Sequence, residues 1–279
     1  MPFADLPPLK VHYQQSGEGA DIVLLHGFTS NLSIWMFGGV MEGLADEYRV
    51  SAVDMRGHGA TNVTPADYTS DVIAEDLLRW MDHVQIESAA LLGHSFGGVV
   101  ATHLASLHPD RVRAIILSDA YFPGLQSLEP NMGQASVWTS LRETLLQVDT
   151  DIGPVVDFPH LFSIVGSWDD RQRKHLREQL GPIGERWLSS LVRLSGTSAG
   201  TDTFATAGLD ADRIAATSVP VLALYDEHSP FEATSKFLNE RLADCRQAVI
   251  PEANHLAPLE NPKAIVAETK SFLSELARR

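Results

Sequence analysis

Residues 89–100 read AALLGHSFGGVV, an apolar run that leads into the pattern Gly-x-Ser-x-Gly at Gly93–Gly97. The run before the pattern predicts a buried strand, and the residues from Phe96 onward predict a helix. A sharp strand-to-helix turn of this kind holds a nucleophilic serine in a strained backbone conformation. The N–H groups and the dipole at the start of the helix favour negative charge developing beside the serine. The stretch therefore predicts Ser95 as a nucleophile.

Short apolar runs alternate with helical patterns on both sides of this stretch. Residues 21–25 (DIVLL) form a continuous apolar run, typical of a strand buried on both faces of a sheet. Residues 69–84 carry apolar side chains at helical spacing, which predicts an amphipathic helix. Further strands are expected at residues 9–15, 49–54, 112–118, 219–224 and 247–250, and further helices at residues 96–106 and 262–277. The alternation predicts an α/β fold with a mostly parallel central sheet and helices on both faces.

The alternation of apolar strand-like runs with helical patterns stops near Phe122 and resumes at Val219. Between them the chain has helical-looking stretches, including residues 137–148, 169–180 and 185–194, and the aromatic residues Trp138, Phe158, Phe162, Trp168 and Trp187. We expect residues 1–121 and 214–279 to form one core and residues 122–213 to be a helical cap, inserted before the last two strands. A separate middle domain is the alternative, but it would split a sheet whose strands lie on both sides.

Three further segments give the chain a resemblance to the α/β-hydrolase superfamily that extends over nearly all of it. His26-Gly27-Phe28 resembles the oxyanion loop, Asp54–Gly59 resembles a D-x-R-G-x-G segment, and Asn254–Glu260 resembles the stretch with the catalytic histidine. The resemblance implies that the chain has the α/β-hydrolase fold and that His255 is the general base. It also implies an oxyanion hole formed by the N–H groups of Phe28 and Phe96.

The resemblance also implies a catalytic triad of serine, histidine and an acidic residue, and the acidic residue departs from the family pattern. The resemblance places it at Ser229, which has no carboxylate. Some members of the superfamily carry the acid after the preceding strand, ahead of the insertion, and here that strand, at residues 112–118, is followed by Asp119. Parallel strands also bring their carboxyl ends to one edge of the sheet, which places Asp119 within reach of His255. We expect Asp119 to be the acid that orients His255, with Asp226 as the alternative. Glu227, or no acid at all, stays open.

Two other polar segments have a local structural interpretation. Ser229-Pro230-Phe231-Glu232 has the pattern of a capping box, with the serine at the N-cap and the proline at the first helical position. Asn261 and Pro262 likewise suit the start of the last helix. Asp54 is expected to pair with the nearby Arg56 rather than to take part in the chemistry.

A serine nucleophile with a histidine base suits acyl transfer through an acyl-enzyme. Superfamily epoxide hydrolases and haloalkane dehalogenases place an aspartate at the elbow, and Ser95 argues against both. We expect hydrolysis of a carboxylic ester, thioester or lactone of a small molecule. The alternatives are a ligand-binding or receptor protein on the same fold, and a carbon–carbon bond hydrolase or a cofactor-free lyase or oxidase. The cap aromatics suggest an apolar pocket or, the reading we favour, the cap's own core.

The composition excludes several classes of partner. The formal net charge is −15, from 21 Lys and Arg against 36 Asp and Glu, which is unfavourable for binding nucleic acid or anionic membranes. The one cysteine, Cys245, allows no disulfide within the chain and no cysteine-based zinc site. No metal or organic cofactor is implied. The N-terminal residues do not resemble a signal peptide, and we expect a cytoplasmic protein of undetermined oligomeric state.

Overall fold

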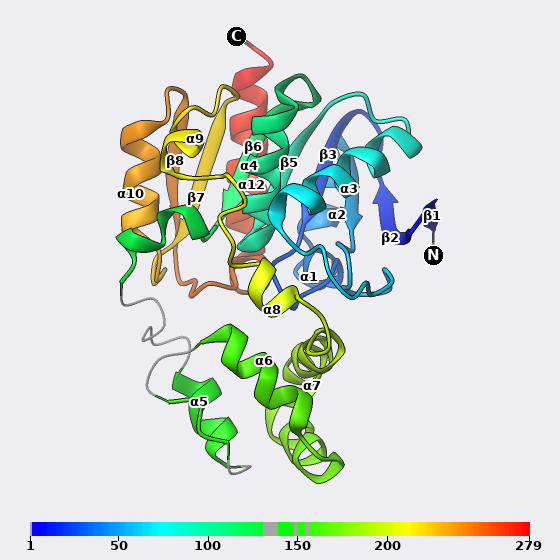
Figure 1. Ribbon diagram of the computed structural model, residues 1–279. Coiled ribbons are helices and arrows are strands. Elements are labelled where there is room, and N and C mark those ends of the chain that lie inside the picture. The colour runs from blue at the N-terminus through cyan, green and yellow to red at the C-terminus, as the bar shows by residue number, and fades with distance from the viewer. Residues whose placement is uncertain (1, 131–138, 148–149, 154–156) are drawn as a thin grey trace.

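The computed structural model describes residues 2–130, 139–147, 150–153 and 157–279. An eight-stranded sheet runs through the molecule in the order β1-β2-β4-β3-β5-β6-β7-β8 (Figure 1). The strands are β1 (Phe3–Leu6), β2 (Leu9–Ser16), β3 (Ala20–Leu25), β4 (Tyr48–Val53), β5 (Ala89–His94), β6 (Val112–Ser118), β7 (Val221–Asp226) and β8 (Cys245–Ile250).

The six strands from β4 to β8 in the sheet order are parallel, whereas β2 pairs antiparallel with both β1 and β4. Every residue of β5 and β7 is buried, as expected for strands covered on both faces. Side chains alternate between the faces, so Val23 and Leu25 join one apolar cluster while Ile22 and Leu24 join the other. The expected mostly parallel sheet of an α/β fold is therefore confirmed.

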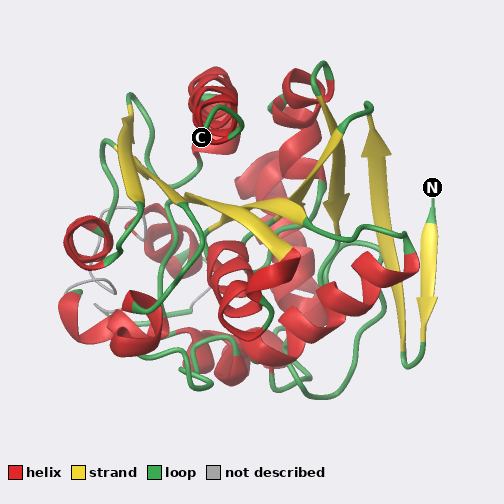
Figure 2. Ribbon diagram, turned by 90° about the horizontal axis from the view of Figure 1, so that it is seen from above, coloured by secondary structure: helices red, strands yellow, loops and turns green. Residues whose placement is uncertain are grey.

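Helices cover both faces of this sheet (Figure 2). On one face, α3 (Ser70–His83) and α4 (Phe96–Leu107) pack on the cluster that contains Val23 and Leu25. On the other face, α1 (Ser33–Phe37), α2 (Val40–Ala45), α11 (Ala257–Glu260) and α12 (Pro262–Leu276) complete the second cluster. The two apolar layers cover both faces of the sheet, and the loops at the carboxyl ends of its strands extend from this core.

Two predicted helix starts had different outcomes. Asn261 is the N-cap of α12, and its side-chain oxygen accepts a hydrogen bond from Ala264 N at 3.3 Å, which confirms the prediction. The predicted capping box at Ser229 is wrong, because α10 (Glu232–Arg241) begins only at Glu232. Ser229 Oγ instead accepts a hydrogen bond from Phe231 N at 3.0 Å, two residues on, in a turn that precedes the helix.

In residues 122–213, the described part contains helices and no strand. They are a 3-10 turn at Pro123–Leu128 (η2), α5 (Thr139–Leu146), α6 (Phe158–Ser167), α7 (Asp170–Leu194), α8 (Ala199–Asp202) and α9 (Ala211–Ala215). The stretches predicted at 169–180 and 185–194 form the single helix α7. Asp169 starts α7 with a capping box that involves Gln172.

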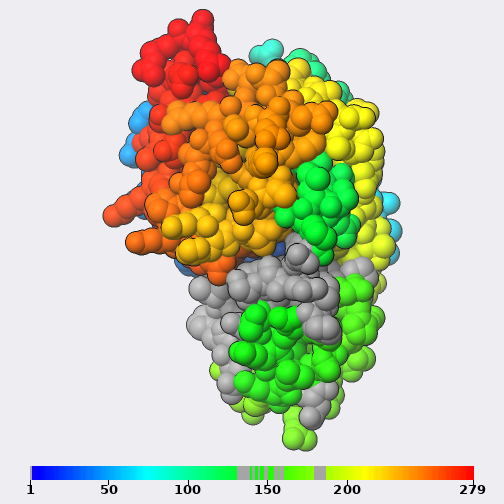
Figure 3. Space-filling view, turned by 90° about the vertical axis from the view of Figure 1, so that its left-hand side faces the viewer, coloured from blue at the N-terminus to red at the C-terminus, as the bar shows by residue number. Residues whose placement is uncertain are grey.

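Whereas η2 lies beside α10, the helices α5, α6 and α7 gather at one end of the molecule (Figure 1 and Figure 3). Their side chains form a third apolar cluster with Tyr68, in which Phe162 and Trp168 are buried and Trp187 is partly buried. These aromatics therefore contribute to a core of the segment itself, as the sequence favoured. Trp138 and the side chain of Phe158 lie outside the described residues. Within the described ranges, no helix has the length and apolarity needed to span a bilayer.

Candidate active site

Ser95 lies between β5 and α4, in the turn that the sequence predicted. Its backbone has φ 51° and ψ −120°, a conformation that costs a non-glycine residue free energy and persists only when its surroundings impose it. The neighbouring strand supplies part of that constraint, since Ser95 N donates a hydrogen bond to Ser118 O at 2.9 Å. The side chain is partly exposed beyond the carboxyl end of the sheet.

The glycines of the pattern are required by crowding of the backbone. A Cβ atom on Gly93 would clash with the backbone of Gly97, and a Cβ atom on Gly97 would clash with the carbonyl of Leu25 in the adjacent strand. Backbone atoms in a sheet cannot move aside as a flexible side chain can. The spacing Gly-x-Ser-x-Gly therefore follows from the close approach of α4 to β3 and β5.

His255 and Asp119 meet across the carboxyl edge of the sheet. His255 follows β8 in a loop, Asp119 follows β6, and both have positive φ, at 68° and 48°. His255 Nδ1 lies 2.6 Å from Asp119 Oδ2, and the carboxylate is fully buried. Because a carboxylate only accepts, Nδ1 carries the proton and Nε2 is left as the basic nitrogen. The structure thus brings these two predicted residues together.

The electrostatic surroundings favour a basic imidazole. Burial lowers the pKa of His255, but the hydrogen bond and charge of Asp119, and the charges of Asp226 and Glu260, raise it by more. The net effect is a His255 pKa above its ordinary value. A raised pKa makes the neutral imidazole a stronger proton acceptor.

Asp226, the alternative acid, lies at the end of β7 beside Asp119. Its Oδ2 accepts a hydrogen bond from Ala257 N at 3.2 Å, at the start of α11, and its own N–H donates to Asp119 Oδ1 at 3.2 Å. Burial, and then the charge of Asp119, raises the pKa of Asp226 to about 7. Its hydrogen bond supports the helix after His255, whereas the hydrogen bond to the His255 ring comes from Asp119.

His94 is a neighbour of His255 that the sequence analysis did not single out. Its Nε2 donates a hydrogen bond to the backbone oxygen of His255 at 2.6 Å, and the two rings lie 5.1 Å apart. Burial and the charge of His255 lower the pKa of His94 to about 3, so the ring stays neutral. Within the described residues, no hydrogen bond joins Ser95 Oγ to His255. Such bonds commonly shorten only when substrate is bound.

One predicted oxyanion donor follows the serine directly in the chain, and the other lies in the loop after β3. Phe96 is the first residue of α4, so its N–H has no acceptor within the helix. Phe28 follows Gly27 in the loop after β3, and a Cβ atom on Gly27 would lie 3.2 Å from Ser95 Cβ. The loop therefore lies next to the serine. The Phe28 ring stacks on Phe162 of α6, with ring centres 5.4 Å apart and planes at 10°.

The expected pairing of Asp54 with Arg56 is wrong. Asp54 Oδ2 lies 2.6 Å from His12 Nδ1, and its oxygens also accept hydrogen bonds from Leu32 N and Ala60 N, both at 2.8 Å. Arg56 pairs instead with Asp76 of α3, at 2.8 Å. Both contacts are made between segments far apart in the sequence. In the described part of the chain, no group of three His, Cys, Asp or Glu side chains is placed to hold a metal ion.

Known proteins are similar to this chain in sequence. A pimeloyl-[acyl-carrier protein] methyl ester esterase of Vibrio campbellii is 30% identical over 270 residues, which cover 94% of this chain and 98% of that protein. A dihydrolipoyllysine-residue acetyltransferase component of an acetoin cleaving system, from Cupriavidus necator, is 41% identical over 116 residues. That match covers 41% of this chain and only 30% of that relative.

Solved structures share the fold over nearly the whole chain. The enol-lactonase of Burkholderia xenovorans LB400 has a TM-score of 0.70 at 21% identity and covers 98% of this chain and 100% of its own. Est816, described as an N-acyl homoserine lactone degrading enzyme, has a TM-score of 0.72 at 22% identity, covering 97% and 100%. A family model described as alpha/beta hydrolase fold matches residues 22–262. Since that match spans most of the chain, the protein belongs to the α/β-hydrolase fold family, and esterases are among its relatives.

Proposed function

We propose that this protein is a serine hydrolase that cleaves a carboxylic ester, a thioester or a lactone of a small molecule. Ser95 is the nucleophile, His255 the general base and Asp119 the acid that orients it. The observation that carries the proposal is the 2.6 Å hydrogen bond between His255 Nδ1 and the buried Asp119, next to a serine in a strained strand-to-helix turn. A buried carboxylate on Nδ1 fixes the tautomer in which Nε2 accepts a proton.

The reaction follows in two balanced halves. Ser95 Oγ attacks the carbonyl carbon while its proton passes to His255 Nε2, and the carbonyl oxygen becomes an oxyanion held by the N–H groups of Phe28 and Phe96. The C–O or C–S bond to the leaving group then breaks, and His255 returns the proton to that group. Water repeats the sequence on the acyl-enzyme, which releases the acid and restores Ser95. Each oxyanion donor typically contributes about 3–4 kcal/mol to the transition state.

The side chains around this chemistry favour an apolar substrate group. Phe28 makes edge contacts with Phe96 and Phe204, at 6.3 and 5.7 Å between ring centres, besides its stacking on Phe162. On the other side, Phe231 lies 5.3 Å from the His255 ring. Rings placed in this way provide apolar surface next to the reacting atoms. The names of the relatives, an esterase and lactone-degrading enzymes, agree with this chemistry.

A fluorophosphonate tests the proposal directly, because it phosphonylates only an activated serine. Intact-mass measurement should show rapid single labelling of the wild type and none of Ser95→Ala. Hydrolysis of p-nitrophenyl esters, acyl thioesters and lactones would then rank the three substrate classes. A wild type that folds but neither labels nor hydrolyses any of them would contradict the proposal and favour a ligand-binding role.

A further inference from the structure

Two buried histidines hold the loop that contains Phe28. His26 Nδ1 lies 2.8 Å from Gly27 O, and Thr29 N donates a hydrogen bond to His58 Nε2 at 3.1 Å. Both rings are almost completely buried, with exposed fractions of 0% and 1%, and their centres lie 5.1 Å apart. The contacts therefore fall on the residue before Phe28 and on the residue after it.

The protonation state of each ring follows from its partners. Met55 N donates to His26 Nε2 at 3.1 Å, so that nitrogen has a lone pair and Nδ1 carries the proton given to Gly27 O. His58 has the same tautomer, because Nε2 accepts from Thr29 while Nδ1 faces Arg56 O at 2.7 Å. Burial lowers the pKa of both rings, that of His58 to about 3. Both imidazoles are therefore neutral at the pH values at which a hydrolase works.

The His26 contact bears on the oxyanion donor through the covalent geometry of the chain. Gly27 O and Phe28 N belong to the same planar peptide group, in which the C=O and N–H bonds point in opposite directions. A hydrogen bond that fixes the carbonyl of Gly27 therefore also fixes the direction of the Phe28 N–H. Ser30 N donates to the same oxygen at 3.1 Å. A hydrogen bond accepted by the carbonyl also polarises the peptide group and strengthens its N–H as a donor.

The next peptide group is held as well. Phe28 O accepts a hydrogen bond from Thr29 Oγ1 at 2.6 Å, and the N–H of the same group is the one that His58 accepts. Thr29 has φ 62°, a strained value for a β-branched residue. The contact with His58 thus holds the chain in a conformation that it would otherwise leave, and it keeps the loop next to Ser95.

We propose that His26 and His58 are positioning residues that aim the N–H of Phe28 at the developing oxyanion. They hold the peptide groups on the two sides of the Phe28 Cα atom. This proposal rests on the assignment of Phe28 as an oxyanion donor. Neither histidine touches the substrate, so removing one should weaken binding of the transition state and leave binding of the ground state unchanged.

Three variants of His26 separate positioning from packing. His26→Asn places an amide N–H near the position of Nδ1 and can still donate to Gly27 O. His26→Gln places its amide near Nε2, toward Met55, and His26→Leu keeps neither contact. With p-nitrophenyl butyrate we expect His26→Asn to retain kcat within about threefold, whereas His26→Leu and His26→Gln lose about 10- to 100-fold at a KM within about twofold of wild type.

A transition-state mimic supplies a readout that a purely structural role would not move. An alkyl trifluoromethyl ketone forms a hemiketal oxyanion with an active serine, and its inhibition constant should weaken by the same factor as kcat falls. His103→Leu is the matched control, because His103 is also buried but contacts Ser70 on α3. If His26→Leu does not fold, His58→Ala with His58→Gln gives the same comparison, and the glutamine variant, which can accept from Thr29 N, should retain more activity.

Three results would overturn the positioning role: wild-type kcat in His26→Leu or His58→Ala, losses in His26→Asn as large as those in His26→Leu, or a rise in KM that accounts for the whole loss. These outcomes require a wild type that labels with the fluorophosphonate. A wild type that does not label would instead overturn the hydrolase proposal, and the positioning role with it.

Discussion

Asp119 Oδ2 and His255 Nδ1 lie 2.6 Å apart although 136 positions separate the two residues in the chain. Replacement of the carboxylate by an amide should leave the fold intact and allow the wrong tautomer of the imidazole. We expect Asp119→Asn to lower kcat/KM on a p-nitrophenyl ester by about 10³–10⁴-fold. Asp226→Asn is the matched comparison, and at pH 8 it should lose less than about tenfold, since the amide can still accept from Ala257 N. A larger loss in Asp226→Asn would make Asp226 the acid.

The pH dependence of turnover should respond to Asp226. Activity requires neutral His255, so kcat/KM should rise with pH through a His255 pKa that lies above its ordinary value. The charge of Asp226 is one of the influences that raise this pKa. In Asp226→Asn the acidic limb of the pH–rate profile should therefore move to lower pH. The measurement is kcat/KM between about pH 5 and 9 for both proteins, and a shift toward higher pH would contradict the electrostatic account.

The stability of the fold should also depend on pH through the carboxyl group of Asp226, and the direction of this dependence can be stated. Burial raises the folded-state pKa of Asp226 to about 7 from an ordinary value of 3.8. The folded state then binds the proton more tightly than the unfolded state, so this group's contribution is fully present below pH 3.8 and is lost as pH rises through about 7. Asp226→Asn lacks this loss. Its melting temperature relative to wild type should rise between pH 5 and pH 8, and a constant difference would show that the group is not desolvated as the fold implies.

Most of the fold could be predicted because strands and helices are specified by patterns within a few neighbouring residues. The strand predicted at 112–118 is β6, the one predicted at 21–25 lacks only the first residue of β3, and the one predicted at 49–54 is shifted by one residue from β4. Each of these segments is rich in apolar side chains. The strand β1 was missed. It is a four-residue edge strand in which every second side chain is exposed, so its apolar signal is short.

The site was less predictable where its contacts are long-range. Ser95 has a signature because the turn itself demands glycines at fixed offsets. No pattern within a few residues shows that His12 pairs with Asp54, or that His94 donates to the carbonyl of His255. Asp119 could be proposed because some members of the superfamily carry the acid after this strand and because parallel strands end at one edge of the sheet. The His58 contact with Thr29 depends on how two loops pack, which is set by tertiary structure alone.

The crowding in the strand-to-helix turn predicts that its glycines cannot be replaced without loss of stability. A Cβ atom on Gly97 would clash with backbone atoms of Leu25 and His26, whereas a Cβ atom on Gly196 would meet no atom within 4 Å. We expect Gly97→Ala to lower the free energy of unfolding by about 1–3 kcal/mol and to abolish labelling of Ser95, because the turn must open to make room. Gly196→Ala should change stability by less than about 0.5 kcal/mol. Urea denaturation with fluorophosphonate labelling measures both, and equal effects of the two substitutions would contradict the role of crowding.

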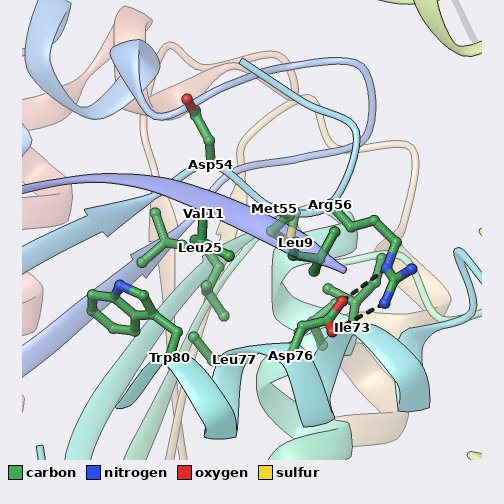
Figure 4. A pocket seen from close by; sticks show the side chains of 12 residues that line it. Leu9, Val11, Leu25, Asp54, Met55, Arg56, Ile73, Asp76, Leu77 and Trp80 are labelled. Carbon is green, nitrogen blue, oxygen red and sulfur yellow. Dashed lines mark hydrogen bonds and ion pairs between the residues drawn. The ribbon is translucent and has the colours of Figure 1, made fainter. Parts of the chain in front are cut away.

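The Arg56–Asp76 ion pair can be used to test how much a buried charge that has lost its partner lowers the free energy of unfolding. The two side chains are 6% and 10% exposed and lie beside a hollow lined by Leu9, Ile73, Leu77 and Trp80 (Figure 4). Burial already raises the pKa of Asp76 above its ordinary value, despite the hydrogen bond and charge of Arg56 that lower it. Arg56→Leu should therefore lose about 3–5 kcal/mol of stability at pH 8, because it removes the hydrogen-bonded partner of the buried carboxylate and leaves only Arg79, at 3.9 Å.

The loss in Arg56→Leu should shrink toward pH 5, since without Arg56 the pKa of Asp76 rises further and the carboxyl binds a proton in the folded state. The double variant Arg56→Leu/Asp76→Leu should recover much of the stability at pH 8, because two apolar side chains replace two charges that had to be desolvated. Urea denaturation of the two single variants and the double variant at both pH values completes the cycle. Additive losses that do not depend on pH would show that the pair contributes through packing of its methylene groups and not through its charges.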